Sequence, residues 1–115
     1  MQLSRPDFDR LLRQFEATAV PEELRRQSRV LTRRRLTIVT DPDDPDRPMA
    51  DVVLRDISPA GIAITHHTGM PVGKRFEMMF PADGEERSAI VCVVRNCQML
   101  KQHLFRIGAE FEART

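Results

Sequence analysis

The chain has 115 residues, 41% hydrophobic and 30% charged, a balance that is typical of one globular domain and not of a disordered segment. Its net charge of +1 excludes a global attraction to polyanions, so a charge that recruits a ligand must be local. Two cysteines are too few for a disulfide framework, and six phenylalanines without tryptophan or tyrosine offer little stacking surface for single-stranded nucleic acid.

The amino terminus has no apolar segment of the signal-peptide type. The longest apolar run, Ala89 to Val94, is far shorter than the ~20 residues that cross a bilayer. We therefore expect a cytoplasmic protein without membrane insertion.

Residues 1–20 predict a short amphipathic helix that ends before Pro21, with Ser4 and Asp7 as candidate amino-terminal caps. Four apolar side chains share one helical face by their i, i+3, i+4, i+7 spacing: Phe8, Leu11, Leu12 and Phe15. We expect this face to cover an apolar side of the domain formed by residues 21–115. The alternative is docking to a partner or to a second copy of the chain, as a homodimer.

From Leu36 onward, β-like runs alternate with turn residues. Six runs have this character: Leu36 to Thr40, Ala50 to Asp56, Gly61 to His66, Arg75 to Phe80, Ser88 to Cys97 and His103 to Phe111. They predict a mainly β fold, a six-stranded antiparallel β-barrel over about residues 33–113 behind the short N-terminal α-helix. The acidic segment Asp41 to Asp46 lacks the glycine and distal Glu of an EF-hand loop, so we interpret it as a hairpin connection.

An arginine segment, residues 24–35, joins the helix to the barrel and contains no lysine. Its six arginines are Arg25, Arg26, Arg29, Arg33, Arg34 and Arg35. A guanidinium can grip a phosphate or the O6/N7 edge of guanine with two hydrogen bonds and can stack on a base. By itself such a run is more often a solvated face. We interpret the last three, at the start of the first predicted strand, as strand surface and not as ligand contacts.

A second motif, Asp56-x-Ser58-x-x-Gly61, lies between two predicted strands. The Asp carboxylate can accept from the N1 and N2 donors of guanine, and the Ser hydroxyl can bond a phosphate or hold the turn. Glycine permits positive φ or close approach of a ligand. The same residues would also suit a plain hairpin turn.

Two motifs in this order resemble the paired signature of the PilZ domain family, bacterial receptors for cyclic di-GMP: Arg25-x-x-x-Arg29 and Asp56-x-Ser58-x-x-Gly61. The resemblance covers about residues 24–113 and includes Val30, Gly73 and a closing Ile107-Gly108-Ala109-Glu110-Phe111 run. It implies a PilZ-type barrel whose arginine segment wraps over cyclic di-GMP on the barrel surface.

The resemblance further implies which residues bind cyclic di-GMP: Leu24, Arg25, Arg26, Arg29, Asp56, Ser58 and Gly61. The arginines would contact guanine bases and phosphates, and the second motif would complete those contacts. Leu24, an apolar residue just before the first motif arginine, favours one ligand per domain over a stacked pair. No cofactor besides this ligand is implied.

These features together predict a second-messenger receptor. Cyclic di-GMP would order the arginine segment and so signal to an effector protein that controls motility, biofilm formation or secretion. The alternatives are a nucleotide-independent interaction adaptor with a PilZ-like barrel, which the intact motifs disfavour, and nucleic-acid binding through the Arg25 to Arg35 run, which we do not expect.

Catalysis and metal binding find no support in the sequence. It contains no Gly-x-Ser-x-Gly elbow and no phosphate-cradling glycine loop, so we expect no enzymatic activity. Cys92 and Cys97 would point to opposite faces of a regular strand and could not share a zinc ion unless a bulge intervenes, and we interpret the histidines as surface residues. No metal site is therefore expected.

Overall fold

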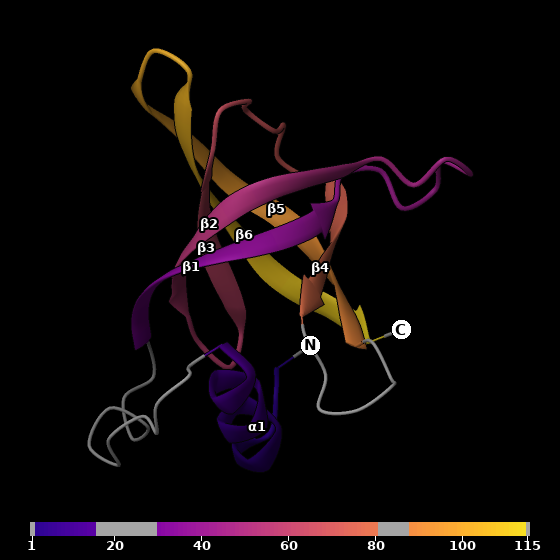
Figure 1. Ribbon diagram of the computed structural model, residues 1–115, viewed down its shortest axis with the longest axis vertical. Coiled ribbons are helices and arrows are strands. Elements are labelled where there is room, and N and C mark those ends of the chain that lie inside the picture. The colour runs from indigo at the N-terminus through magenta and orange to yellow at the C-terminus, as the bar shows by residue number, and fades with distance from the viewer. Residues whose placement is uncertain (1, 16–29, 81–87, 115) are drawn as a thin grey trace.

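The computed structural model describes residues 2–15, 30–80 and 88–114 (Figure 1). These residues form one helix and six strands: α1 (Arg5–Phe15), β1 (Val30–Val39), β2 (Met49–Ile57), β3 (Gly61–His66), β4 (Arg75–Phe80), β5 (Ser88–Lys101) and β6 (Leu104–Arg114). The strands close into a barrel in the order β1-β2-β3-β6-β5-β4, and every neighbouring pair is antiparallel. The predicted fold class, a six-stranded antiparallel barrel with a short N-terminal helix, is confirmed.

The barrel interior is filled by alternate side chains of the strands, because successive residues of a strand point to opposite faces. Its fully buried members include Ile38, Leu54, Ile64, Phe76, Met78, Ile90, Cys92, Ile107 and Phe111. On β6 this alternation buries Ile107, Ala109 and Phe111. The opposite face of β6 is therefore available on the outside of the barrel.

Helix α1 packs across one end of the barrel (Figure 1). Phe8, Leu11 and Leu12 belong to the same buried cluster as the barrel side chains, so for these three residues the predicted covering role is confirmed. Ser4 caps the helix, because its Oγ accepts a hydrogen bond from the Asp7 amide at 3.3 Å. The Phe15 side chain and residues 16–20 lie outside the described part.

A homodimer through this helical face stays a prediction. Phe8, Leu11 and Leu12 are buried within a single chain, so the helix would have to leave the barrel before the face could meet a second copy. Among the described residues, no helix has the length and apolar character needed to cross a membrane.

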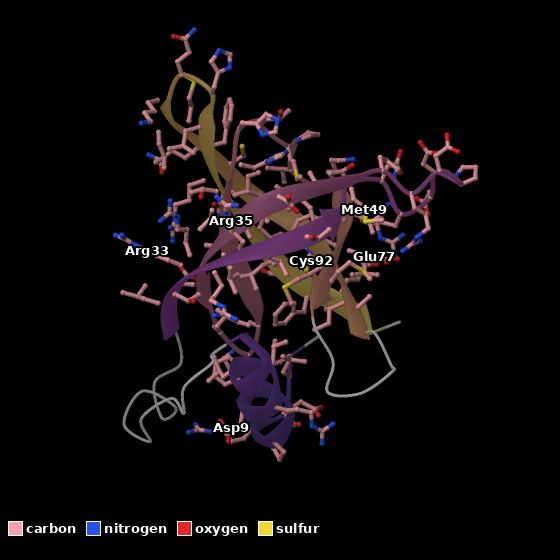
Figure 2. The ribbon with its side chains drawn as sticks, viewed as in Figure 1. Asp9, Arg33, Arg35, Met49, Glu77 and Cys92 are labelled. Carbon is pink, nitrogen blue, oxygen red and sulfur yellow. The ribbon has the colours of Figure 1, made fainter. Side chains whose placement is uncertain are left out.

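Two strands extend well beyond their predicted ends, whereas β2 gains one residue at each end and β6 gains three at its carboxyl end. β1 begins at Val30 and not at Leu36, because Val30 and Leu31 pair with the end of β2 at Ile57 and Asp56. The sequence does not predict this pairing, because the three arginines that follow are all exposed and give no alternation of apolar and polar residues. The register also shifts between Leu31 and Arg34. Figure 2 shows Arg33 and Arg35 on the outside of the barrel.

The other extension is at β5, which was predicted to end at Cys97 and continues to Lys101. It forms a hairpin with β6 in which Lys101 pairs with Leu104. The acidic segment Asp41 to Asp46 makes the predicted connection between β1 and β2, where the Asp44 amide donates to the Asp41 carbonyl at 3.2 Å.

The two cysteines lie on a strand with a bulge, the exception that the sequence interpretation left open. Cys92 pairs with Phe111 and Cys97 with Ile107, so both cysteines point to the same side of the sheet. A bulge between Val94 and Asn96 shifts the alternation by one residue. The thiols still cannot share a metal ion, because five residues of strand separate their Cα atoms by roughly 15 Å. Burial raises the pKa of the Cys92 thiol to about 12.

His66 also departs from expectation, because it is buried and not a surface residue. It ends β3, a central strand whose six residues are all buried. Its ring contacts the exposed His67 ring, with 4.3 Å between centroids, and its Nδ1 has no hydrogen-bond partner in the described part of the chain. Burial, and secondarily the charge of His67, lowers the pKa of His66 below its ordinary value of 6.5.

We predict that Phe8→Ala lowers the free energy of unfolding by about 3–5 kcal/mol, because it leaves a cavity under α1. Arg10→Ala, on the exposed face of the same helix, changes it by no more than about 0.5 kcal/mol. Urea unfolding of both variants measures the difference. Equal stabilities would contradict the docking of α1 on the barrel.

We also predict a pH dependence that originates at His66. Below pH 6.5 the unfolded chain protonates this imidazole while the folded chain does not, so stability falls as pH decreases from 6.5 toward the lowered folded pKa. Urea unfolding between about pH 5 and 7.5 detects the fall. His66→Gln removes this contribution, whereas His103→Gln, at an exposed position, retains it. An unchanged fall in His66→Gln would exclude His66 as its source.

Candidate functional site

The turn from Ser58 to Gly61 is held by its own hydrogen bonds. The Ser58 amide donates to the Gly61 carbonyl at 2.9 Å, and Ser58 Oγ accepts from the amides of Ala60 and Gly61 at 3.3 Å each. Two neighbours secure it from outside, because the Leu3 amide donates to the Pro59 carbonyl at 2.7 Å and the Phe111 amide to the Ala60 carbonyl at 2.8 Å. The turn is therefore a fixed element of the barrel rim.

Gly61 is required by the close approach of β3 to β6. A Cβ atom at this position would lie 2.0 Å from the Ala109 carbonyl oxygen, a distance that no side chain tolerates. Of the two reasons that the sequence suggested for a glycine, the structure shows a close approach, and the group that approaches is the backbone of a neighbouring strand.

Asp56 is buried at the end of β2, on the outer face of the barrel wall. Its Oδ2 accepts a hydrogen bond from Nη2 of Arg106 on β6 at 2.7 Å, and the side chains are 6% and 39% exposed. This pair joins strands that are separated by β3. Thr65 of β3 lies directly opposite Arg106 and accepts from Nε of Arg55 at 3.1 Å. The outer face thus carries a polar network across three strands.

A hollow of about 320 Å³ lies beside this network, at the low end of the size range of small-molecule sites. Its lining comes from β2, the turn, β3, β5 and β6: Asp56, Ser58, Ala60, Gly61, Ile62, Ala63, Arg95, Asn96, Arg106, Gly108, Ala109 and Glu110. Ala63 and Gly108 are directly paired across β3 and β6, and the Asn96 side chain lies against Gly108, where a Cβ atom would be 2.7 Å from Asn96 Nδ2. Arg95 and Glu110 form an exposed ion pair at 3.3 Å. The hollow therefore combines an amide with charged side chains.

The predicted site residues divide into two groups. Asp56, Ser58 and Gly61 all line the hollow, so the structure brings the second motif together. Leu24 and the three motif arginines, Arg25, Arg26 and Arg29, lie outside the described residues. Arg33, Arg34 and Arg35 are exposed on β1, in agreement with their interpretation as strand surface.

Four lining residues were not among the predicted site residues: Arg95, Asn96, Arg106 and Gly108. Arg106 and Gly108 lie on the face of β6 away from the core, and the register of β6 with β3 carries that face beside Asp56. Arg95 and Asn96 follow a bulge that simple alternation does not predict.

We predict that Arg106→Gln lowers the free energy of unfolding by about 1–3 kcal/mol, because it removes a charge-assisted partner of the buried Asp56 carboxylate. Arg95→Gln serves as a matched control, since its ion pair with Glu110 is 52% and 60% exposed and should contribute about 0–1 kcal/mol. Urea unfolding measures both. A loss in Arg95→Gln as large as that in Arg106→Gln would contradict this ranking.

The chain is similar to one family of known proteins. The family model described as the PilZ domain matches residues 23–115, a range that contains both motifs and every residue of the hollow but not α1. No curated protein matches the chain. PilZ domains are binding and adaptor modules of the cyclic di-GMP receptor family. With a family model that covers most of its length, this chain belongs to the PilZ domain family.

Proposed function

We propose that this protein is a cytoplasmic receptor for cyclic di-GMP. One observation carries the proposal: the Asp56, Ser58 and Gly61 triad lines a single polar hollow beside the first residues of β1, which the motif arginines directly precede in the sequence. Membership of the PilZ family supplies the class of ligand.

Chain connectivity supports a site made of both motifs. Val30 pairs with Ile57 and Leu31 with Asp56, so the start of β1 lies against the end of β2. Arg29 is bonded to Val30, and consecutive Cα atoms are about 3.8 Å apart. An arginine at that point can therefore reach across the second motif toward the hollow.

The chemistry of the hollow suits this ligand. Cyclic di-GMP has two phosphodiester charges, which the guanidinium groups of Arg25 and Arg29 would neutralise together with those of Arg95 and Arg106 on the barrel. Its guanines present N1 and N2 donors to Asp56, a carboxylate that already accepts a charged hydrogen bond from Arg106. Asn96, whose side-chain amide lies against Gly108, adds a hydrogen-bonding group to the hollow.

The expected free energy of binding is sufficient for a second-messenger receptor. Hydrogen bonds to charged groups contribute about 1.5–3 kcal/mol each. Several of them, less the entropy of ordering the arginine segment, correspond to micromolar affinity or tighter. With an apolar Leu24 before the first motif arginine, we propose one ligand per domain.

The proposed output is a change in the conformation of the segment around Arg25 to Arg29 when the ligand binds. Such a change creates a new surface that an effector protein can recognise. The regulated process would then be motility, biofilm formation or secretion, and the protein itself would bind and not catalyse.

We predict that Arg25→Ala, Arg29→Ala and Asp56→Asn each weaken cyclic di-GMP binding at least tenfold, because each removes a charged contact to the ligand. Arg33→Ala, which changes an exposed arginine of β1 outside the motif, retains the wild-type affinity. Isothermal titration calorimetry measures the affinities, and urea unfolding verifies that each variant is folded. Wild-type affinity in Arg25→Ala or Arg29→Ala would overturn the proposed site.

A further inference from the structure

The outer half of β5 departs from the rest of the barrel. From Arg95 to His103 every residue is exposed, which gives this part of the β5–β6 hairpin solvent on both faces. Figure 1 shows the hairpin projecting past the end of the barrel, at the side opposite α1. An isolated two-stranded ribbon is only marginally stable, so the projecting part of the hairpin adds little to the stability of the barrel. We therefore looked to binding for the reason for its length.

One edge of this ribbon has no neighbouring strand among the described residues. β4 pairs with β5 only as far as Val93, and Val94 makes the last contacts, with the Gly73 amide and the Lys74 carbonyl. Beyond Val94 none of the described strands pairs with that side of β5, while the other side continues to pair with β6 as far as Lys101. Alternate backbone N–H and C=O groups of residues 95–101 therefore point outward, as in a template for an added strand.

The side chains along this edge combine apolar surface with positive charge. Met99 and Leu100 are 64% and 49% exposed, two of the largest hydrophobic exposures of the described residues. Residues 95–106 contain Arg95, Lys101 and Arg106 but neither Asp nor Glu, in a chain that has 17 acidic residues. Two of these cations are already paired, Arg95 with Glu110 and Arg106 with Asp56, so Lys101 is the cation of this segment that has no ion pair among the described residues. The edge is thus suited to a negatively charged and partly apolar partner.

We propose that the β5 edge, residues 95–101, is a docking surface for an extended, acidic segment of a partner protein that adds to the sheet as a further strand. Main-chain hydrogen bonds supply affinity in this mode, and side chains supply specificity. That the partner is the effector of the receptor rests on the proposed function, whereas the docking geometry does not. Because Arg95 and Asn96 belong both to this edge and to the hollow, nucleotide and partner would meet at the base of the hairpin.

Two other occupants fit the edge less well. A second copy of the chain would bring Arg95 and Lys101 against the same cations, and like charges opposite one another destabilise a strand pair. An anionic bilayer would satisfy the charge and accept Met99 and Leu100, but its hydrocarbon offers no partner to the outward backbone groups. An acidic strand with apolar side chains can pair with the positive charge, cover Met99 and Leu100, and form hydrogen bonds with the outward backbone groups.

The test uses a short synthetic peptide in which Glu alternates with Val, and a second peptide in which Lys replaces Glu. Amide hydrogen exchange, followed by nuclear magnetic resonance on the full chain, reports on residues 95–101. We expect the acidic peptide to slow exchange of the outward amides of β5 in a saturable manner and the basic peptide to have no effect.

Met99→Glu should weaken the acidic peptide about tenfold, since it places a carboxylate on the edge. Met49→Glu is the matched control, because Met49 is 67% exposed on β2 and lies away from the hairpin (Figure 2). Both positions are exposed, so neither variant threatens the fold.

The proposal is overturned if the acidic peptide gives no protection or if Met99→Glu and Met49→Glu bind it equally. It is also overturned if phosphatidylglycerol vesicles or duplex DNA protect the edge better than the peptide, or if the edge is protected by self-association without it. Cyclic di-GMP titrations on the same variants separate the two proposals. A wild-type chain that binds the peptide but not the nucleotide would contradict the proposed function alone.

Discussion

The close contact between β3 and β6 determines the geometry of the candidate site. At Gly61 the two backbones approach until even a Cβ atom would collide with the Ala109 carbonyl. From that point the register runs without a shift to His66 opposite Phe105. This register sets Gly108 opposite Ala63, and Arg106 opposite Thr65, within reach of Asp56. A slip by one residue would turn Arg106 and Gly108 toward the core. The hollow is therefore a consequence of how the barrel closes.

Helix α1 adds a second constraint on the same region. It lies outside the part of the chain that the family model matches, yet its apolar face is buried in the barrel core. The Leu3 amide just before it bonds to the Pro59 carbonyl in the Ser58 to Gly61 turn. Helix docking and the shape of the turn are thus linked through the backbone.

Much of the fold could be predicted from the sequence. Strands β3 and β4 have the predicted ends, because Gly, Pro and Asp residues bound them and apolar side chains fill them. β1 and β5 were predicted too short, because polar and charged residues replace the alternation where these strands continue beyond the packed interior. The six-stranded architecture follows from the number and spacing of the strands, which these errors do not change.

The site was only partly predictable, for reasons of strand register. Asp56, Ser58 and Gly61 are neighbours along the chain, so their motif was visible. Arg106 lies 50 residues from Asp56 and reaches it only through the pairing of β6 with β3. His66 was misplaced because burial of a central strand is a property of the assembled sheet, and the bulge in β5 that turns Cys97 is one as well.

The most direct test of the proposed receptor is a calorimetric titration of the wild-type chain with cyclic di-GMP, with its linear form and with a DNA duplex, each at two salt concentrations. The account predicts saturable binding of one cyclic di-GMP per chain, weaker binding of the linear form, and little binding of DNA at the higher salt. Equal affinity for the cyclic and linear nucleotides, or DNA binding that is tighter and falls steeply with salt, would contradict it.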